Sequence, residues 1–158
     1  MRREQNEIKS INEICQILDK CSVCRLAINN NGYPYVVPMN FGYKKGKEKL
    51  FLFFHGANAG TKKALIEKDG RVGFEMDIHG NVEIREIACN SYMEYESVCG
   101  TGNAEIIEEN KKREYLESIM NHYTDIPYEM LDKMIESVMV IKVEVVQITG
   151  KFYKAKEK

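Results

Sequence analysis

The sequence predicts an antiparallel β-barrel with packed helices. Runs rich in β-branched and aromatic residues follow one another in hairpin succession, and turns containing glycine or asparagine separate them. The helical segments do not alternate regularly with the strands, as a doubly wound parallel sheet would require, and no G-x-G-x-x-G motif stands in a strand–helix–strand frame. With 158 residues, 44% of them hydrophobic and 30% charged, the chain is long enough for a single domain, residues 1–158, with its own core.

A helix is the first predicted element, within residues 8–21. Apolar residues recur there at the spacing of one helical face. Residues 10–13, Ser-Ile-Asn-Glu, have the form of a capping box, and Ile8 is placed to act as a hydrophobic staple.

Six strands follow. Residues 30–32, Asn-Asn-Gly, provide the positive-φ positions of a hairpin turn. Pro38 cannot donate to a ladder, so it marks an edge, a bulge or the approach of a ligand. Gly100 and Gly102 indicate a bulge or a close backbone approach, and residues 79–94 are expected to mix loop and extended structure. The predicted strands are 23–28, 35–43, 49–55, 71–78, 95–107 and 138–149; a helix is predicted at 61–68, and a helical insertion over about 108–137 contains helices 108–123 and 128–136.

The composition excludes some classes of function. A formal net charge of −1 and a pI near 6.3 give no electrostatic case for binding nucleic acid or an anionic membrane. No apolar run approaches the roughly 20 residues of a membrane span. The polar start of the chain leads into no signal-peptide core, so a cytoplasmic location is expected.

The five cysteines do not form a disulfide framework, since their number is odd and their spacing loose. Cys21 and Cys24 form a C-x-x-C, but a zinc site needs two further ligands, and Cys89 and Cys99 are not at ligand spacing. No metal is therefore expected. The pair is interpreted as small packed hydrophobes, and a redox role for Cys89 is left open.

Residues 55–63, His-Gly-Ala-Asn-Ala-Gly-Thr-Lys-Lys, are the most informative segment. They leave an apolar strand, cross a glycine-containing loop and enter a helix, whose first N–H groups favour an anion. Thr61 adds a hydroxyl donor, and Lys62 and Lys63 add positive charge suited to phosphate. The order of residues is not that of a P-loop. Two interpretations stand: a phosphate cradle beside His55, or an ordinary solvated helix start beside a structural histidine.

A resemblance to a known family rests on segments that follow one another in order. They are residues 23–28 (VCRLAI), 32–43 (GYPYVVPMNFGY), 54–57 (FHGA) with 60–62 (GTK), 72–77 (VGFEMD) and 95–102 (YESVCGTG). Together they resemble the pyridoxamine 5′-phosphate oxidase-related FMN-binding family, in the branch that includes 5-nitroimidazole reductases. The resemblance runs from Arg25 to about Lys151.

The resemblance implies a six-stranded antiparallel split β-barrel that forms a homodimer, with FMN bound across the subunit interface. It places residues 38–40 along the isoalloxazine ring, Thr61 and Lys62 on the phosphate, and His55 near the flavin as the catalytic residue. Thr61 stands where the family is expected to have arginine. The implied cofactor-binding residues are Arg25, Pro38, Met39, Asn40, His55, Thr61, Lys62, Ser97 and Val98.

The resemblance also implies the activity. It is that of an FMN-dependent oxidoreductase, passing electrons from a reduced nicotinamide or another donor to a small nitro-aromatic acceptor. Pyridoxamine phosphate oxidation is not favoured, because that enzyme's C-terminal substrate motif has no counterpart after Lys151. The alternative is a non-catalytic carrier or sensor of flavin, haem or deazaflavin. Since the redox chemistry belongs to the cofactor, no acid–base dyad need appear.

Overall fold

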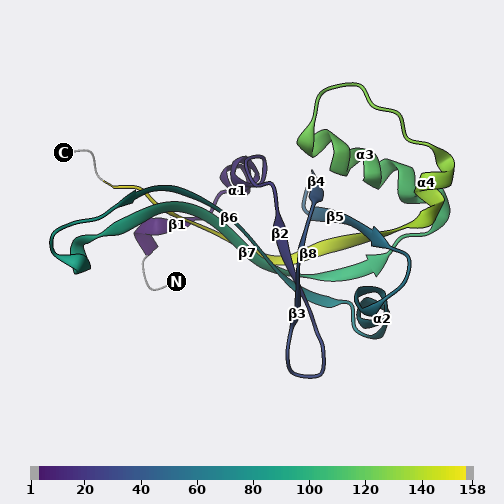
Figure 1. The fold of residues 1–158 in the computed structure, drawn as a ribbon, viewed down its shortest axis with the longest axis horizontal. Helices are drawn as coiled ribbons and strands as arrows, with labels where there is room; N and C mark the ends of the chain where they lie inside the picture. Colours follow the sequence, from purple (N-terminus) through teal and green to yellow (C-terminus); the bar gives the residue numbers. More distant parts are fainter. Residues whose placement is uncertain (1–3, 156–158) are drawn as a thin grey trace.

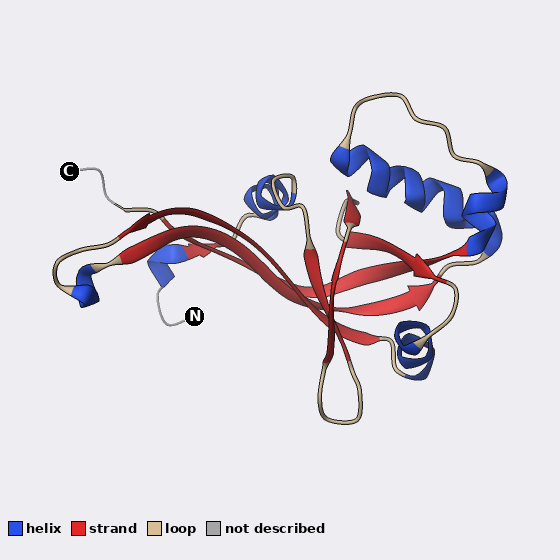
Figure 2. Cartoon of the chain, in the orientation of Figure 1, coloured by secondary structure: helices blue, strands red, loops and turns tan. Residues whose placement is uncertain are grey.

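An antiparallel sheet of eight strands forms the centre of the computed structural model, which describes residues 4–155 (Figures 1 and 2). The strands are β1 (Glu7–Ile8), β2 (Cys24–Ile28), β3 (Tyr35–Met39), β4 (Phe41–Lys45), β5 (Leu50–Ala57), β6 (Arg71–Glu83), β7 (Tyr92–Ile106) and β8 (Val138–Tyr153). The helices are α1 (Ile11–Leu18), α2 (Thr61–Lys68), α3 (Lys112–Tyr123) and α4 (Asp132–Ser137), with 3₁₀ turns η1 (Glu4–Asn6), η2 (Ala88–Asn90) and η3 (Glu109–Lys111).

The strand order explains how the sheet becomes a split barrel. It runs β3-β2-β6-β7-β8-β5-β4, and β1 adds to β8. The two end strands, β3 and β4, are separated in sequence by Asn40 alone, so one bent segment supplies both ends of the sheet. The strand predicted at 35–43 is therefore divided in two. This division and the unpredicted β1 account for eight strands where six were expected.

Local predictions about turns and edges are confirmed. Asn31 (φ 49°) and Gly32 (φ 100°) have positive φ in the turn between β2 and β3. Pro38 lies in β3, an edge strand, where its missing N–H costs no ladder bond to a further strand. The register between β7 and β8 shifts between Thr101 and Gly102, as the glycines predict.

The β6–β7 hairpin forms a long twisted ribbon that extends away from the barrel (Figure 1). Residues 79–94, expected to mix loop and extended structure, do so: β6 continues to Glu83, β7 begins at Tyr92, and η2 lies between them. The register slips between His79 and Val82. This ribbon is therefore longer than the predicted strands 71–78 and 95–107.

The core fills the barrel interior, because alternate residues of each strand point inward. Leu26, Phe41, Phe54, Met76 and Val98 are among its fully buried side chains. Helix α1 adds its apolar face, as predicted, with Ile14, Ile17 and Leu18 buried. Ser10 is the N-cap of α1 but makes no side-chain cap bond, so the capping box is not formed.

The helical insertion lies over one end of the sheet, where α3 packs on β4 and β5 (Figure 2). Gly42 permits a close approach, because a Cβ there would clash with the backbone of Ser118 in α3. The prediction of a helix from residue 128 is wrong, since α4 begins at Asp132. Leu131, just before it, is extended (φ −79°, ψ 131°), and the Arg113 guanidinium donates to the Met130 carbonyl (3.1 Å) and to the Asp132 carboxylate (2.5 Å), contacts that favour this start. No helix within residues 4–155 has the length and apolarity to cross a membrane.

Candidate functional site

The junction of β5 and α2 has the predicted order of strand, loop and helix, although β5 continues beyond its predicted end at residue 55. Strand β5 ends at Ala57, and Gly60 has φ 106°, a conformation that favours glycine. Helix α2 begins at Thr61; no side chain caps it, and its first turn holds no acidic residue. The first N–H groups of α2 therefore lack a side-chain acceptor at an electropositive helix end, which favours an anion.

Lys62 is the charged group at this junction. Its side chain is half-buried, its Nζ donates to Met39 Sδ at 3.5 Å, and burial lowers its pKa. Within residues 4–155, no carboxylate oxygen lies within 4.0 Å of it. Neighbouring Lys63, by contrast, lies 3.9 Å from the Glu67 carboxylate. Lys62 is thus a partly desolvated cation without a counter-charge, which an anionic ligand would supply.

Glycine at position 56 permits the approach of Lys62. A Cβ at Gly56 would lie 2.9 Å from Lys62 Nζ and 3.9 Å from the Met139 methyl carbon. Any other residue would therefore push the ammonium group away from β5. The sequence predicts a loop position for Gly56, but the contact of Gly56 with Lys62 depends on the packing of α2 against β5.

His55 lies one residue before Gly56, at the end of β5. Its side chain is partly exposed and lines an apolar cavity beside α3. Burial, and then the positive charge of Lys62, lower the pKa of His55 below its ordinary value. The imidazole is therefore uncharged at neutral pH and offers one hydrogen-bond donor and one acceptor.

Residues 38–40 reach the junction through Met39, the last residue of β3. Met39 is buried and touches Lys62, whereas Pro38 and Asn40 are exposed. Asn40 is the residue at which the chain passes from β3 to β4. The structure thus brings together Met39 and Lys62, with Thr61 at the adjoining helix start. His55 lies on the opposite face of β5, because consecutive residues of a strand point to opposite faces.

Arg25 and Ser97 belong to a second cluster, on the outward face of the sheet. Arg25 Nη1 lies 2.9 Å from Glu75 Oε2 and 2.5 Å from Asp77 Oδ1, and these contacts raise its pKa. Ser97 is paired in register with Asp77. Val98 points the opposite way and is fully buried in the core. Arg25 is therefore already neutralised by two carboxylates that the predicted site did not include. Their i, i+2 spacing in the sequence indicates that both lie on the same face of one strand.

The sequence profile of the pyridoxamine 5′-phosphate oxidase family matches residues 10–152. The chain belongs to this family. No curated protein sequence matches it significantly.

Solved structures agree with this membership. A candidate 5-nitroimidazole antibiotic resistance protein from Bacteroides thetaiotaomicron VPI-5482 is 31% identical, with 92% of this chain and 86% of that chain covered and a TM-score of 0.80. The flavocytochrome Anf3 from Azotobacter vinelandii has a TM-score of 0.82 at 21% identity, covering 98% and 72%. The FAD and haem binding protein from Mycobacterium smegmatis has 0.80 at 15% identity, covering 97% and 76%. The latter two show the shared fold.

The cysteines of this pyridoxamine 5′-phosphate oxidase family member do not form a reactive pair. Cys21 and Cys24 are free and buried, and burial raises their pKa to about 11 and about 12, which keeps both thiols protonated. Their interpretation as packed hydrophobes agrees with their place in the core. No group of three potential metal ligands occurs within residues 4–155.

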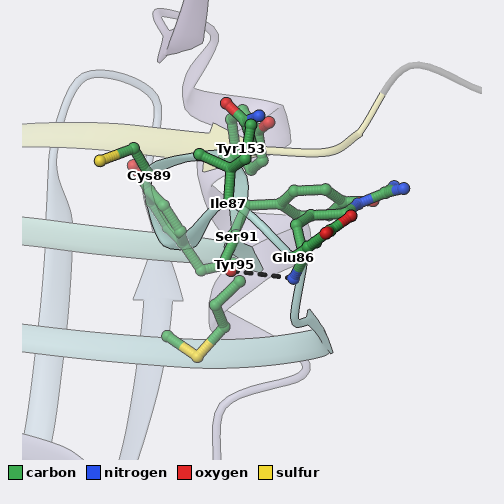
Figure 3. Close-up of a pocket in the computed structure, with 10 residues that line it drawn as sticks. Glu86, Ile87, Cys89, Ser91, Tyr95 and Tyr153 are labelled. Carbon is green, nitrogen blue, oxygen red and sulfur yellow. Dashed lines mark hydrogen bonds between the residues drawn. The ribbon is translucent and has the colours of Figure 1, made fainter.

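Cys89 belongs to η2, at the tip of the β6–β7 ribbon, which extends away from the barrel and α2 (Figure 1). Figure 3 shows its surroundings. It lines an open cavity of about 1000 Å³ together with Ile87, Tyr95 and Tyr153. The Arg85 N–H donates to Ser91 Oγ (3.0 Å), which fixes the turn. In this chain Cys89 therefore cannot reach His55 or Lys62 of the same copy.

Proposed function

We propose that this chain binds FMN and reduces a small organic acceptor of the nitro-aromatic type, with electrons from a reduced nicotinamide or another donor. One observation carries the proposal. Lys62 holds a partly buried positive charge at a helix start, without a carboxylate partner in the described part of the chain. Such a group weakens the fold unless an anion neutralises it, and the phosphate of FMN is such an anion.

The residues at the junction fit FMN. Lys62, the Thr61 hydroxyl and the first N–H groups of α2 hold the phosphate. Pro38, Met39 and Asn40 lie along the ring, which needs a flat and largely apolar surface. FMN supplies the electron-transfer chemistry when bound. His55, with its lowered pKa, presents an uncharged imidazole that hydrogen-bonds the acceptor and orients it.

Membership of the family supports this cofactor, and the printed name of the 31% identical relative supports a nitro-aromatic acceptor. Thr61 contributes no charge to the cradle. Lys62 is consequently the main cationic ligand of the phosphate in this chain.

The functional unit in this proposal is a homodimer with the flavin between subunits. Its support is the outward face of the sheet that carries Arg25 and Ser97. Val36 and Val146 are 54% and 61% exposed on it, and a cavity of about 550 Å³ opens there beside Thr101. A second copy on this face would bury these side chains and bring Arg25 and Ser97 towards a junction of the other copy. Val98 keeps Ser97 in position by anchoring β7 in the core. Analytical ultracentrifugation tests the dimer; a protein that stays monomeric when loaded with FMN contradicts it.

Spectroscopy tests the cofactor and the activity in turn. Purified protein should be yellow and release a chromophore that runs as FMN; colourless protein that fails to bind added FMN would refute the proposal. Released FAD or haem would replace FMN as the cofactor. Under anaerobic conditions NADH should bleach the protein and a nitroimidazole should restore its colour, while buffer alone should not. The protein is a carrier if neither NADH nor a dithionite-reduced donor can reduce the bound flavin. It is also a carrier if the acceptor cannot reoxidise the reduced flavin.

A further inference from the structure

An apolar cavity of about 490 Å³ lies beneath the helical insertion. It is open to solvent on one side and is lined by α3, by the segment leading into α4, by α4 itself and by the start of β8. His55 reaches it from the face of β5 that α3 covers, the same face on which Phe53 stacks with Tyr115 (ring centroids 4.6 Å apart). A cavity of this volume accommodates a small organic molecule.

The walls of this cavity are apolar and adaptable. Methionine side chains fill irregular space and make favourable contacts with aromatic rings. Met134 and Leu131 are 63% and 57% exposed, so apolar side chains lie at the mouth of the cavity rather than within the core. The wall residues include Leu116, Met120, Met130, Met134, Ile135 and Val138.

Among the polar side chains of the cavity, His55 is the one that offers a ligand both a free hydrogen-bond donor and an acceptor. Tyr128 also lines the cavity, but its hydroxyl donates to Asn121 Oδ1 at 2.8 Å. The exposed Glu129 carboxylate also lines the cavity, but it can only accept a hydrogen bond. The His55 imidazole makes no side-chain hydrogen bond within residues 4–155. Its lowered pKa leaves it uncharged, so it does not attract an anion strongly.

We propose that this cavity binds one small, uncharged aromatic molecule, with a hydrogen-bonding substituent directed at His55. A flat ring matches the methionine walls, whereas a charged ligand would lose its hydration among apolar side chains. As a binding site the cavity stands independently of the activity proposed above. Its role as the acceptor site rests on that proposed function.

Two probes of similar size and different charge test the chemistry of the cavity. The full-length protein, as purified, is titrated with 4-nitrobenzyl alcohol and with 4-nitrobenzoate by calorimetry. We expect saturable binding of the neutral alcohol, and binding of the anion weaker by at least about 10-fold because its carboxylate must be desolvated. Equal affinity for the two, or no saturable binding of the alcohol, would overturn the proposal.

Methionine methyl NMR locates the bound probe. In isotope-labelled wild-type protein the alcohol should shift the methyl signals of Met120, Met130 and Met134 and leave that of Met93, at the ribbon tip, unchanged. Met120→Trp fills the cavity and should weaken binding at least about 10-fold, and the matched Met93→Trp should not. Should Met120→Trp fail to fold, the wild-type shifts decide the matter. Shifts confined to other methionines contradict the proposed site.

The outcomes separate this inference from the proposed function. If the protein is colourless but binds the alcohol at these methionines, the binding site is supported and the flavoprotein proposal is refuted. Protein that reduces the alcohol's nitro group with NADH, yet shows no change at these methyl signals, keeps the activity and refutes this cavity as the acceptor site.

Discussion

Replacing Lys62 by methionine separates the effect of its charge on stability from the effect of that charge on FMN binding. The substitution keeps an unbranched apolar chain beside Met39 and removes the half-buried ammonium. Because burial lowers the pKa of Lys62, the folded state disfavours its charged form, and removing that charge should not weaken the fold. We expect the unfolding free energy of the apo-protein to stay within about 0.5 kcal/mol of wild type or to rise.

The affinity for FMN should change in the opposite direction. A hydrogen bond to a charged group contributes about 1.5–3 kcal/mol. Lys62 is only half-buried, so solvent screening places its contribution near the lower end. At about 1.4 kcal/mol per tenfold, Lys62→Met should weaken FMN binding roughly 10- to 30-fold.

Quenching of flavin fluorescence on titration into apo-protein measures the affinity, and urea unfolding of the same apo-protein measures the stability. Lys63→Met is the matched control, because Lys63 already has a carboxylate and the Asn58 carbonyl (3.5 Å) within reach; its effect on affinity should stay below about 3-fold. FMN affinity of Lys62→Met within about 3-fold of wild type would refute the phosphate cradle. A loss of more than about 1 kcal/mol in the apo-protein would instead make Lys62 a structural residue.

Three further predictions concern protonation, thiol reactivity and packing. The pKa of His55, measured by NMR titration, should lie below the ordinary value of about 6.5, and Lys62→Met should raise it. Because the unfolded chain takes up the proton at a higher pH than the folded chain, His55 makes the unfolding free energy fall as pH drops below about 6.5. A measured His55 pKa above that value contradicts the prediction. Iodoacetamide at pH 8 should label exposed Cys89 in the native protein and spare Cys21 and Cys24, whose pKa values are raised; mass spectrometry of peptides reads this out, and rapid labelling of the buried pair would argue against a closed core. Gly42→Ala should lower stability by about 1–3 kcal/mol in thermal unfolding, because its methyl group meets the backbone of α3, and an unchanged midpoint would show that α3 is not packed as described.

Features that depend on short stretches of sequence were predictable. The start of α2 at Thr61, the positive-φ turn at Asn31 and Gly32, and the bulge beside Gly102 each follow from local backbone preferences. Helix α4 was harder to predict, because contacts at its start come from Arg113, which is distant from it in sequence.

The junction of β5 and α2 likewise combines features set by neighbouring residues with features set by distant ones. The sequence by itself determined that an apolar strand leads into the junction, that a helix begins at Thr61 and that two lysines lie in its first turn, because these are properties of neighbouring residues. Only the tertiary structure decided which lysine is the unusual one. Lys62 is turned into the space left by Gly56 and against Met39, while Lys63 is turned towards Glu67. The same packing neutralises Arg25 through two carboxylates of another strand and places His55 beside an apolar cavity. The sequence shows which side chains carry a charge. Whether an opposite charge neutralises each of them depends on groups that only the folded sheet and its helices bring within a few ångströms.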